Sequence, residues 1–177
     1  MKVGIVLGSV RDGRAGEAVA NWVAKGAAGR EATYELIDLK AFDVPLLTTN
    51  THPMRAKKSY DDERVQAWSD AIDACDAYIF VTPEYNHGVP GALKNAVDSL
   101  GQEWVGKTAA LVGYGSVGGV RAIENWRLVL ANFSMTVTRA ELNLNSFFDW
   151  ADGLFAPLER RTQELTDLLD ALEKAAG

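Results

Sequence analysis

Short runs of apolar, often β-branched residues recur along the chain and predict five β-strands. Three of these runs, at residues 3–7, 77–82 and 109–113, are almost continuously apolar. Such runs are typical of central strands in a parallel sheet that is covered on both faces. Less uniform runs at residues 34–39 and 135–142 predict the remaining two strands.

Segments with helical spacing separate the predicted strands. Residues 61–75 place apolar side chains three and four positions apart, on one face of a helix. Further helices are expected at 17–26, at 92–100, around Trp126 and at 154–174. Strand and helix alternate five times, which predicts right-handed βαβ units. We therefore expect an α/β, flavodoxin-like doubly wound fold, with a five-stranded parallel sheet of order 2-1-3-4-5 and helices on both faces.

Length and charge agree with one such domain over residues 1–177. The formal net charge of −6 offers no electrostatic footprint for nucleic acid or an anionic membrane. No apolar stretch approaches the roughly 18 residues of a membrane span, so we expect a soluble, cytoplasmic protein. The single cysteine, Cys75, is expected to be a buried thiol. Residues 44–59 are expected to form a long loop, and loops of that length are usually functional or mobile.

The aromatic residues fall into two groups. Three tryptophans lie on the apolar faces of predicted helices and are expected in the core, namely Trp22, Trp68 and Trp126. Phe147, Phe148 and Trp150 cluster in a segment without a clear period, where they could line a pocket or a subunit contact. Core packing is the default expectation for this second group.

The candidate chemistry begins with a glycine-containing turn at residues 8–16, after the first strand. Free N–H groups and the dipole at the N-terminus of the following helix favour an anion there. Ser9 adds a hydroxyl donor, and Arg11 and Arg14 add charge that suits a phosphate. The turn nearly matches a P-loop, but Arg14 replaces its lysine and Ala15 has no hydroxyl for Mg²⁺, which disfavours an NTPase. An ordinary turn with solvated arginines is the simpler alternative.

A second candidate loop, at residues 82–96, follows the third strand and is stiffened by proline and glycine. Tyr85 offers an aromatic wall and Asn86 offers both a donor and an acceptor, a combination that suits a flat heteroaromatic ligand. His87 beside such a ligand could shuttle protons, but with no second histidine or cysteine nearby no metal site is expected. Glu84 could contact the ligand or pair with a neighbouring arginine.

The third candidate is the turn at residues 113–119, which matches the G-x-G-x-x-G dinucleotide fingerprint. That fingerprint usually belongs to the first βα unit, whereas here it follows the fourth strand. Glu141, the nearest acidic residue in the next strand, is poorly placed for a ribose. The turn could instead form a backbone wall beside a ligand held by the first two loops, or be a simple connection.

The first two loops resemble the NAD(P)H-dependent FMN reductase family, which includes quinone, azo-compound and chromate reductases. The resemblance is carried by Gly-Ser-x-Arg at 8–11 and by Pro-Glu-Tyr-Asn at 83–86 followed by Pro-Gly-Ala-Leu-Lys-Asn at 90–95. The order of strands and helices matches over essentially the whole chain. The resemblance implies that the first turn holds the FMN phosphate, through Ser9, Arg11 and the region of Arg14, Ala15, Gly16 and Glu17. It implies that the isoalloxazine is lined by Pro83, Glu84, Tyr85, Asn86, His87 and Ser116.

Two positions depart from the family pattern. Arg14 stands where many relatives carry a serine, so a guanidinium would replace one hydroxyl contact to the phosphate. His87 and Gly88 occupy a place where a serine is common, which puts a side-chain contact to the flavin there in doubt. Neither departure removes the backbone donors of the first turn.

The resemblance implies an oxidoreductase that passes hydride from NAD(P)H through bound FMN to quinones or similar acceptors by a ping-pong mechanism. No side chain need act as acid or base, because the cofactor carries the chemistry. Family members are commonly homodimers or homotetramers. The alternatives are a nicotinamide dehydrogenase that uses the turn at 113–119, and a flavodoxin-like electron carrier or FMN-binding sensor without NAD(P)H turnover.

Overall fold

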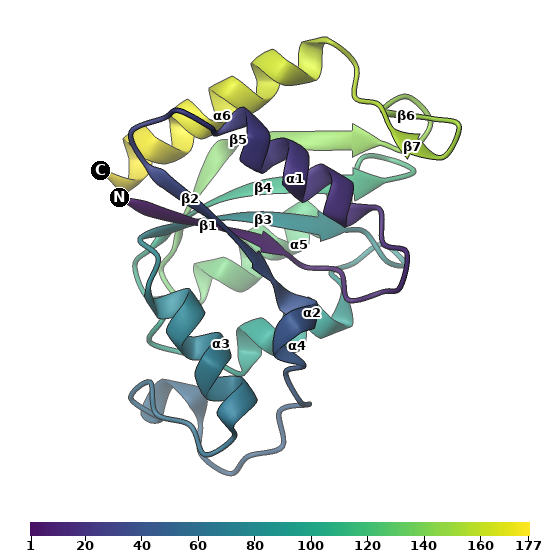
Figure 1. Ribbon diagram of the computed structural model, residues 1–177. Coiled ribbons are helices and arrows are strands. Elements are labelled where there is room, and N and C mark those ends of the chain that lie inside the picture. Colours follow the sequence, from purple (N-terminus) through teal and green to yellow (C-terminus); the bar gives the residue numbers. More distant parts are fainter.

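The computed structural model describes residues 1–177 and has a five-stranded parallel sheet at its centre (Figure 1). The strand order is β2-β1-β3-β4-β5, which confirms the expected flavodoxin-like topology. The three runs predicted as central strands form β1, β3 and β4, all of them almost wholly buried. The strands are β1 (Lys2–Leu7), β2 (Thr33–Asp38), β3 (Ala77–Pro83), β4 (Thr108–Gly115) and β5 (Thr136–Asn145).

Helices cover both faces of the sheet (Figure 1). One face carries α1 and α6, whose valine and leucine side chains pack on β1, β3, β4 and β5. The other face carries α3, α4 and α5, with Trp68, Trp104 and Trp126 fully buried between them and the sheet. The helices are α1 (Gly16–Gly26), α2 (Leu39–Phe42), α3 (Glu63–Asp73), α4 (Gly91–Asp98), α5 (Val120–Ala131) and α6 (Arg160–Ala176). Cys75 is buried as expected, and no helix has the length and apolarity needed to cross a membrane.

The region after β5 differs from its prediction. The last helix begins at Arg160, not at residue 154, because Leu154 belongs to a small hairpin of β6 (Trp150–Ala151) and β7 (Leu154–Phe155). The turn of this hairpin, Asp152-Gly153, has positive φ at both residues, as a tight two-residue hairpin requires. Pro157 follows, and a proline there ends any helical register from the preceding residues.

Core packing was the wrong expectation for two aromatic residues next to this hairpin. Phe147 and Phe148 are 74% and 66% exposed, while Trp150 is half-buried against Phe155. Asp149, in the same segment, is a fully buried carboxylate that accepts hydrogen bonds from the Arg161 guanidinium and so ties the segment to α6. The two phenylalanines therefore stand on a firmly anchored turn and point apolar surface outward.

The predicted long loop joins α2 to α3 and contains one short 3-10 turn, Pro53–Arg55. The side chains of Asn95 and Glu103 attach this loop to the rest of the protein. Asn95 donates to the Pro45 carbonyl and accepts from the Leu47 amide. The fully buried carboxylate of Glu103 accepts from the Tyr60 hydroxyl at 2.8 Å. The loop is thus long but tethered at both ends.

Candidate functional site

The strand order reverses between β1 and β3, which lie side by side in the centre of the sheet. From β1 the chain passes to β2 on one side, and later to β3 on the other. In doubly wound sheets ligands bind at this switch point, beyond the carboxyl ends of the strands. Leu7 and Val81 are register partners, and the Gly8 amide donates to the Val81 carbonyl at 3.0 Å. The loops that follow β1 and β3 therefore leave the sheet next to each other.

Two of the predicted residues in the first turn contact Tyr85 in the second loop. Ser9 is buried, and its Oγ lies 3.1 Å from the Tyr85 Oη. The Arg11 guanidinium carbon lies 5.9 Å from the centre of the Tyr85 ring, within cation–π range. Arg11 is exposed and forms no ion pair. The structure thus brings an unneutralised cation and an aromatic ring together at the switch point.

Arg14 is placed differently from Arg11. Its side chain is only 8% exposed, and its guanidinium makes a two-pronged ion pair with Asp38 at the end of β2. Nη1 also donates to the Ser9 carbonyl at 2.8 Å. Hydrogen bonding to Asp38 raises the pKa of Arg14 above its ordinary value. The guanidinium is therefore engaged within the protein, and it does not extend into solvent as Arg11 does.

The first turn of α1 offers backbone donors. Its N-cap residue, Ala15, has no side chain that could accept a hydrogen bond, so the amides of this turn have no side-chain partner. Gly16 is buried, and a Cβ there would lie 2.4 Å from the Tyr114 hydroxyl, which shows how closely the turn approaches β4. Glu17 is exposed in the first turn of α1. Uncapped amides, a hydroxyl and a free guanidinium form the donor set that a phosphate requires.

The second loop ends in a tight turn. Tyr85 and Gly88 exchange two backbone hydrogen bonds, of 3.1 and 3.0 Å. Between them Asn86 and His87 have φ values of 49° and 69°, a conformation that non-glycine residues rarely adopt. Both residues are exposed, whereas Pro83 is buried at the end of β3. Strained backbone of this kind is concentrated at ligand sites, because surrounding structure must hold it in place.

Glu84 pairs with an arginine, which is one of the two roles predicted for it. Its carboxylate accepts from the Arg121 side chain at 2.8 Å and from the Arg121 amide at 3.0 Å. It therefore caps the N-terminus of α5, where a negative charge is stabilised by the helix dipole. The Glu84 amide donates to the Tyr114 carbonyl. These contacts join the loop after β3 to the turn after β4.

The glycines of the third turn pack against one another. A Cβ at Gly119 would lie 2.6 Å from the Tyr114 nitrogen, and one at Gly113 would lie 2.9 Å from the Gly118 carbonyl oxygen. The fingerprint spacing is thus explained by the close packing of the turn. Ser116 is exposed at the tip, where its carbonyl accepts from the Asn145 side chain.

The same region lacks the acidic group that a dinucleotide site needs. Glu141 lies inside β5, where its carboxylate accepts from Arg127 at 2.5 Å. Asp38, at the end of β2, is bound by Arg14. Both carboxylates are bound by arginines within the protein, which disfavours the dehydrogenase alternative.

Comparison with known proteins agrees with this geometry. Residues 1–149 match the family model described as NADPH-dependent FMN reductase. The chain belongs to the NADPH-dependent FMN reductase family. An NAD(P)H-dependent FMN reductase of Schizosaccharomyces pombe is 38% identical, over 99% of this chain and 87% of the relative. A quinone reductase of Escherichia coli is 32% identical, over 73% and 69% of the two chains.

A solved structure extends the agreement to the fold. The chain is similar to FerB, a flavoenzyme NAD(P)H:(acceptor) oxidoreductase of Paracoccus denitrificans, with a TM-score of 0.73 and 25% identity. The likeness covers 98% of this chain and 97% of FerB. This member of the FMN reductase family is therefore an enzyme of the reductase class with a flavodoxin-like fold, and the family uses FMN and NAD(P)H.

Three residues near the switch point of the sheet make contacts that the sequence does not predict. Asp38 holds Arg14, Arg121 holds Glu84, and Tyr114 packs against the start of α1. Burial raises the pKa of the Tyr114 hydroxyl above its ordinary value. Asp38 and Tyr114 lie at the carboxyl ends of β2 and β4, and Arg121 lies in the first turn of α5. Their position at this edge of the sheet is the one signal that could have drawn attention to them.

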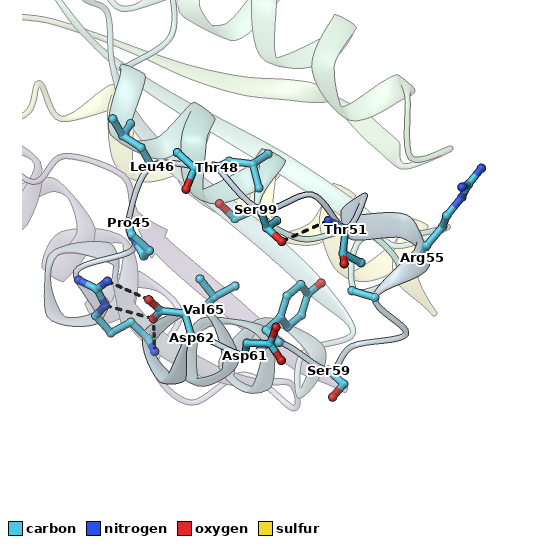
Figure 2. Close-up of a pocket in the computed structure, with 15 residues that line it drawn as sticks. Pro45, Leu46, Thr48, Thr51, Arg55, Ser59, Asp61, Asp62, Val65 and Ser99 are labelled. Atoms are coloured by element: carbon cyan, nitrogen blue, oxygen red, sulfur yellow. Dashed lines mark hydrogen bonds and ion pairs between the residues drawn. The ribbon is translucent and has the colours of Figure 1, made fainter.

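A cavity of this reductase lies elsewhere, between the α2–α3 loop and α3 (Figure 2). It has a volume of about 580 Å³. Its wall carries Asp61 and Asp62, while Arg64 is bound to Asp62 and Arg55 points away from the hollow (Figure 2). With two carboxylates in its wall and Arg64 paired with one of them, this cavity is less suited to a phosphate than the turn after β1.

Proposed function

We propose that this chain binds FMN at the three loops of the switch point and uses it to reduce small-molecule acceptors with NAD(P)H. The observation that carries the proposal is the junction of an unpaired arginine, an uncapped helix N-terminus and an aromatic ring at one edge of the sheet. Family membership supplies the identity of the cofactor. The residues assigned to the FMN site are Ser9, Arg11, Arg14, Ala15, Gly16, Glu17, Pro83, Glu84, Tyr85, Asn86, His87 and Ser116.

Within this assignment the first turn binds the phosphate. The Ser9 hydroxyl, the Arg11 guanidinium and the amides that begin α1 are all donors, as a dianion requires. Ser9 also lies within hydrogen-bond distance of Tyr85, so the phosphate turn and the ring-binding loop are positioned together. The first contribution of the protein is therefore a preorganised anion site.

The second and third loops bind the ring system. The turn from Tyr85 to Gly88 presents backbone donors and acceptors, and its shape is fixed by its own two hydrogen bonds. Glu84 holds this loop to α5, which limits its movement when a ligand leaves. Bound FMN would supply the redox chemistry, taking hydride from NAD(P)H and passing electrons to an acceptor in a ping-pong sequence. No side chain of the chain is assigned an acid or base role.

Quinones are the proposed acceptors. Relatives named quinone reductases in Escherichia coli and Pseudomonas putida support this class, because they are 32% and 33% identical over 73% and 68% of this chain. We also propose a homodimer or homotetramer. The exposed Phe147 and Phe148 support an assembly, since apolar surface of this kind is typical of subunit contacts.

The proposal is tested on purified protein by flavin titration and by turnover. FMN should bind with quenching of its fluorescence, and NADPH or NADH should be oxidised steadily once a quinone is added. Steady oxidation separates the enzyme from an electron carrier, which would exchange single electrons without sustained NAD(P)H turnover. A protein that binds neither FMN nor riboflavin, or that binds FMN without oxidising either nicotinamide cofactor, would contradict it.

A further inference from the structure

The two arginines of the first turn have different surroundings. Arg11 is exposed and meets no carboxylate, whereas Arg14 is almost fully buried against Asp38. Arg14 Nη1 lies 2.7 Å from Asp38 Oδ1, and Nη2 lies 2.5 Å from Asp38 Oδ2. A parallel pair of hydrogen bonds of this kind fixes the guanidinium plane as well as its position.

The same guanidinium closes the turn on itself. Nη1 donates to the carbonyl of Ser9 at 2.8 Å, so the last residues of the turn are tied to its first. Asp38 is itself well anchored, because it is the register partner of Leu7 and its Oδ1 accepts from the Lys40 amide as the N-cap of α2. The turn is therefore braced against β2 and α2 before any ligand arrives.

Charge also separates the two arginines. The Arg14–Asp38 pair is formally neutral, and Asp12 is paired in turn with Lys40. Arg11 is the cation of this turn that has no carboxylate partner. The Arg14 guanidinium donates to Asp38 and to the Ser9 carbonyl, so moving it toward a phosphate would break those bonds, whereas Arg11 has no such bonds to break.

We propose that Arg14 is a positioning residue: together with Asp38 it holds the 9–14 turn in the shape that presents Arg11 and the α1 amides, and it makes no side-chain contact to phosphate. This inference rests on the proposed FMN site. It changes the role of Arg14 from ligand to brace and adds Asp38 to the residues on which cofactor binding depends.

The first test uses the protein without flavin. Asp38→Asn keeps the volume of the side chain but removes its charge, and Arg14→Gln removes the guanidinium. Both variants should speed hydrogen exchange of the two sets of hydrogen-bonded amides that flank the turn, the Gly8 amide and the first hydrogen-bonded amides of α1, by about tenfold or more, because a charge-assisted bond is lost. Arg30→Gln is the control, since it disrupts a comparable ion pair with Glu173 outside the turn and should leave this exchange unchanged. Unchanged exchange in Asp38→Asn would overturn the brace.

The second test measures the affinities for FMN and riboflavin. A brace predicts that Asp38→Asn and Arg14→Gln each weaken FMN binding by roughly 3- to 10-fold, that the double variant is no weaker than Arg14→Gln, and that riboflavin affinity is unchanged. Tighter FMN binding by Asp38→Asn would overturn the proposal, because it would mean that the released Arg14 binds phosphate. Wild-type protein that binds neither flavin would refute the proposed function, while the exchange measurement would still decide whether Arg14 braces the turn.

Discussion

The turn after β1 and the turn after β4 look alike in sequence and differ in what their glycines do. Both are glycine-rich, both follow a buried parallel strand and both lead into a helix at the same edge of the sheet. In the first turn, a Cβ at Gly13 would meet nothing within 4 Å. In the turn after β4, a Cβ at Gly119 would meet the backbone of Tyr114 and Gly113 at less than 3 Å. The middle of the first turn, at Gly13, is therefore open, whereas the turn after β4 is filled by its own backbone.

This difference shows why a glycine fingerprint is weak evidence by itself. A glycine can leave room for a phosphate, or it can let two stretches of protein backbone touch. The first turn also has donors that lack internal partners, namely Arg11 and the uncapped start of α1. In the turn after β4, by contrast, the N-terminus of the following helix is capped by Glu84. The presence of free donors, more than the glycine spacing, distinguishes an anion site from a structural turn.

The largest expected effect is that of Gly119→Ala. The left-handed φ of 73° and the contact of 2.6 Å with the Tyr114 nitrogen should together lower the free energy of unfolding by about 3 kcal/mol. Gly13→Ala is the matched control, because it has a similar φ of 63° without any close neighbour, and should cost only about 1 kcal/mol. Urea unfolding of both variants measures the difference. Equal losses of unfolding free energy would mean that the turn after β4 is not tightly packed.

The next effect concerns ligand affinity. Arg11→Ala should weaken FMN binding by roughly 10- to 100-fold, the range expected for losing a charge-assisted hydrogen bond, and should leave riboflavin affinity nearly unchanged. Arg55→Ala removes another arginine without an ion pair, beside the cavity of the α2–α3 loop, and should change neither affinity. Fluorescence titration with both flavins is the measurement. An equal loss for FMN and riboflavin would place Arg11 near the ring, away from the phosphate.

Glu84→Gln tests the third turn by removing the charge from the α5 cap. The variant should lose about 1 kcal/mol of stability, since the dipole interaction and the ion pair with Arg121 are weakened. The ratio of FMN to riboflavin affinity should stay as in the wild type. Thermal unfolding and the two titrations together give the result. A fall in that ratio would show that Glu84 influences the phosphate turn, and the two regions would then not be independent.

The sheet could be predicted from the sequence because buried parallel strands are continuously apolar, and β1, β3 and β4 lie where such runs occur. The start of α6 could not, because Leu154 and Leu158 match a helical spacing, although the Asp152-Gly153 pair is typical of a hairpin turn. Local spacing describes one segment at a time. It does not reveal that a short hairpin interrupts a plausible helix.

The candidate site, too, can be predicted from the sequence only in part. The loops could be located, since the carboxyl ends of parallel strands share one edge. The partners of the charged groups could not, because Arg14 is 24 residues from Asp38 and Glu84 is 37 residues from Arg121. Neither pair has a sequence signature. Two arginines in one turn therefore looked equivalent, although one is braced and the other is free.

The smallest expected effect is that of Ser116→Ala. The Ser116 hydroxyl is exposed and forms no hydrogen bond within the protein, while its carbonyl, which the substitution retains, accepts from Asn145. Stability should therefore change by less than about 0.5 kcal/mol. If the third turn closes the ring edge of the proposed site, the affinities for FMN and riboflavin should fall together, by about 2- to 5-fold, as expected for one neutral hydrogen bond. A fall in FMN affinity alone would instead place Ser116 at the phosphate. The turn after β4 would then bind the phosphate together with the turn after β1, and not the ring edge.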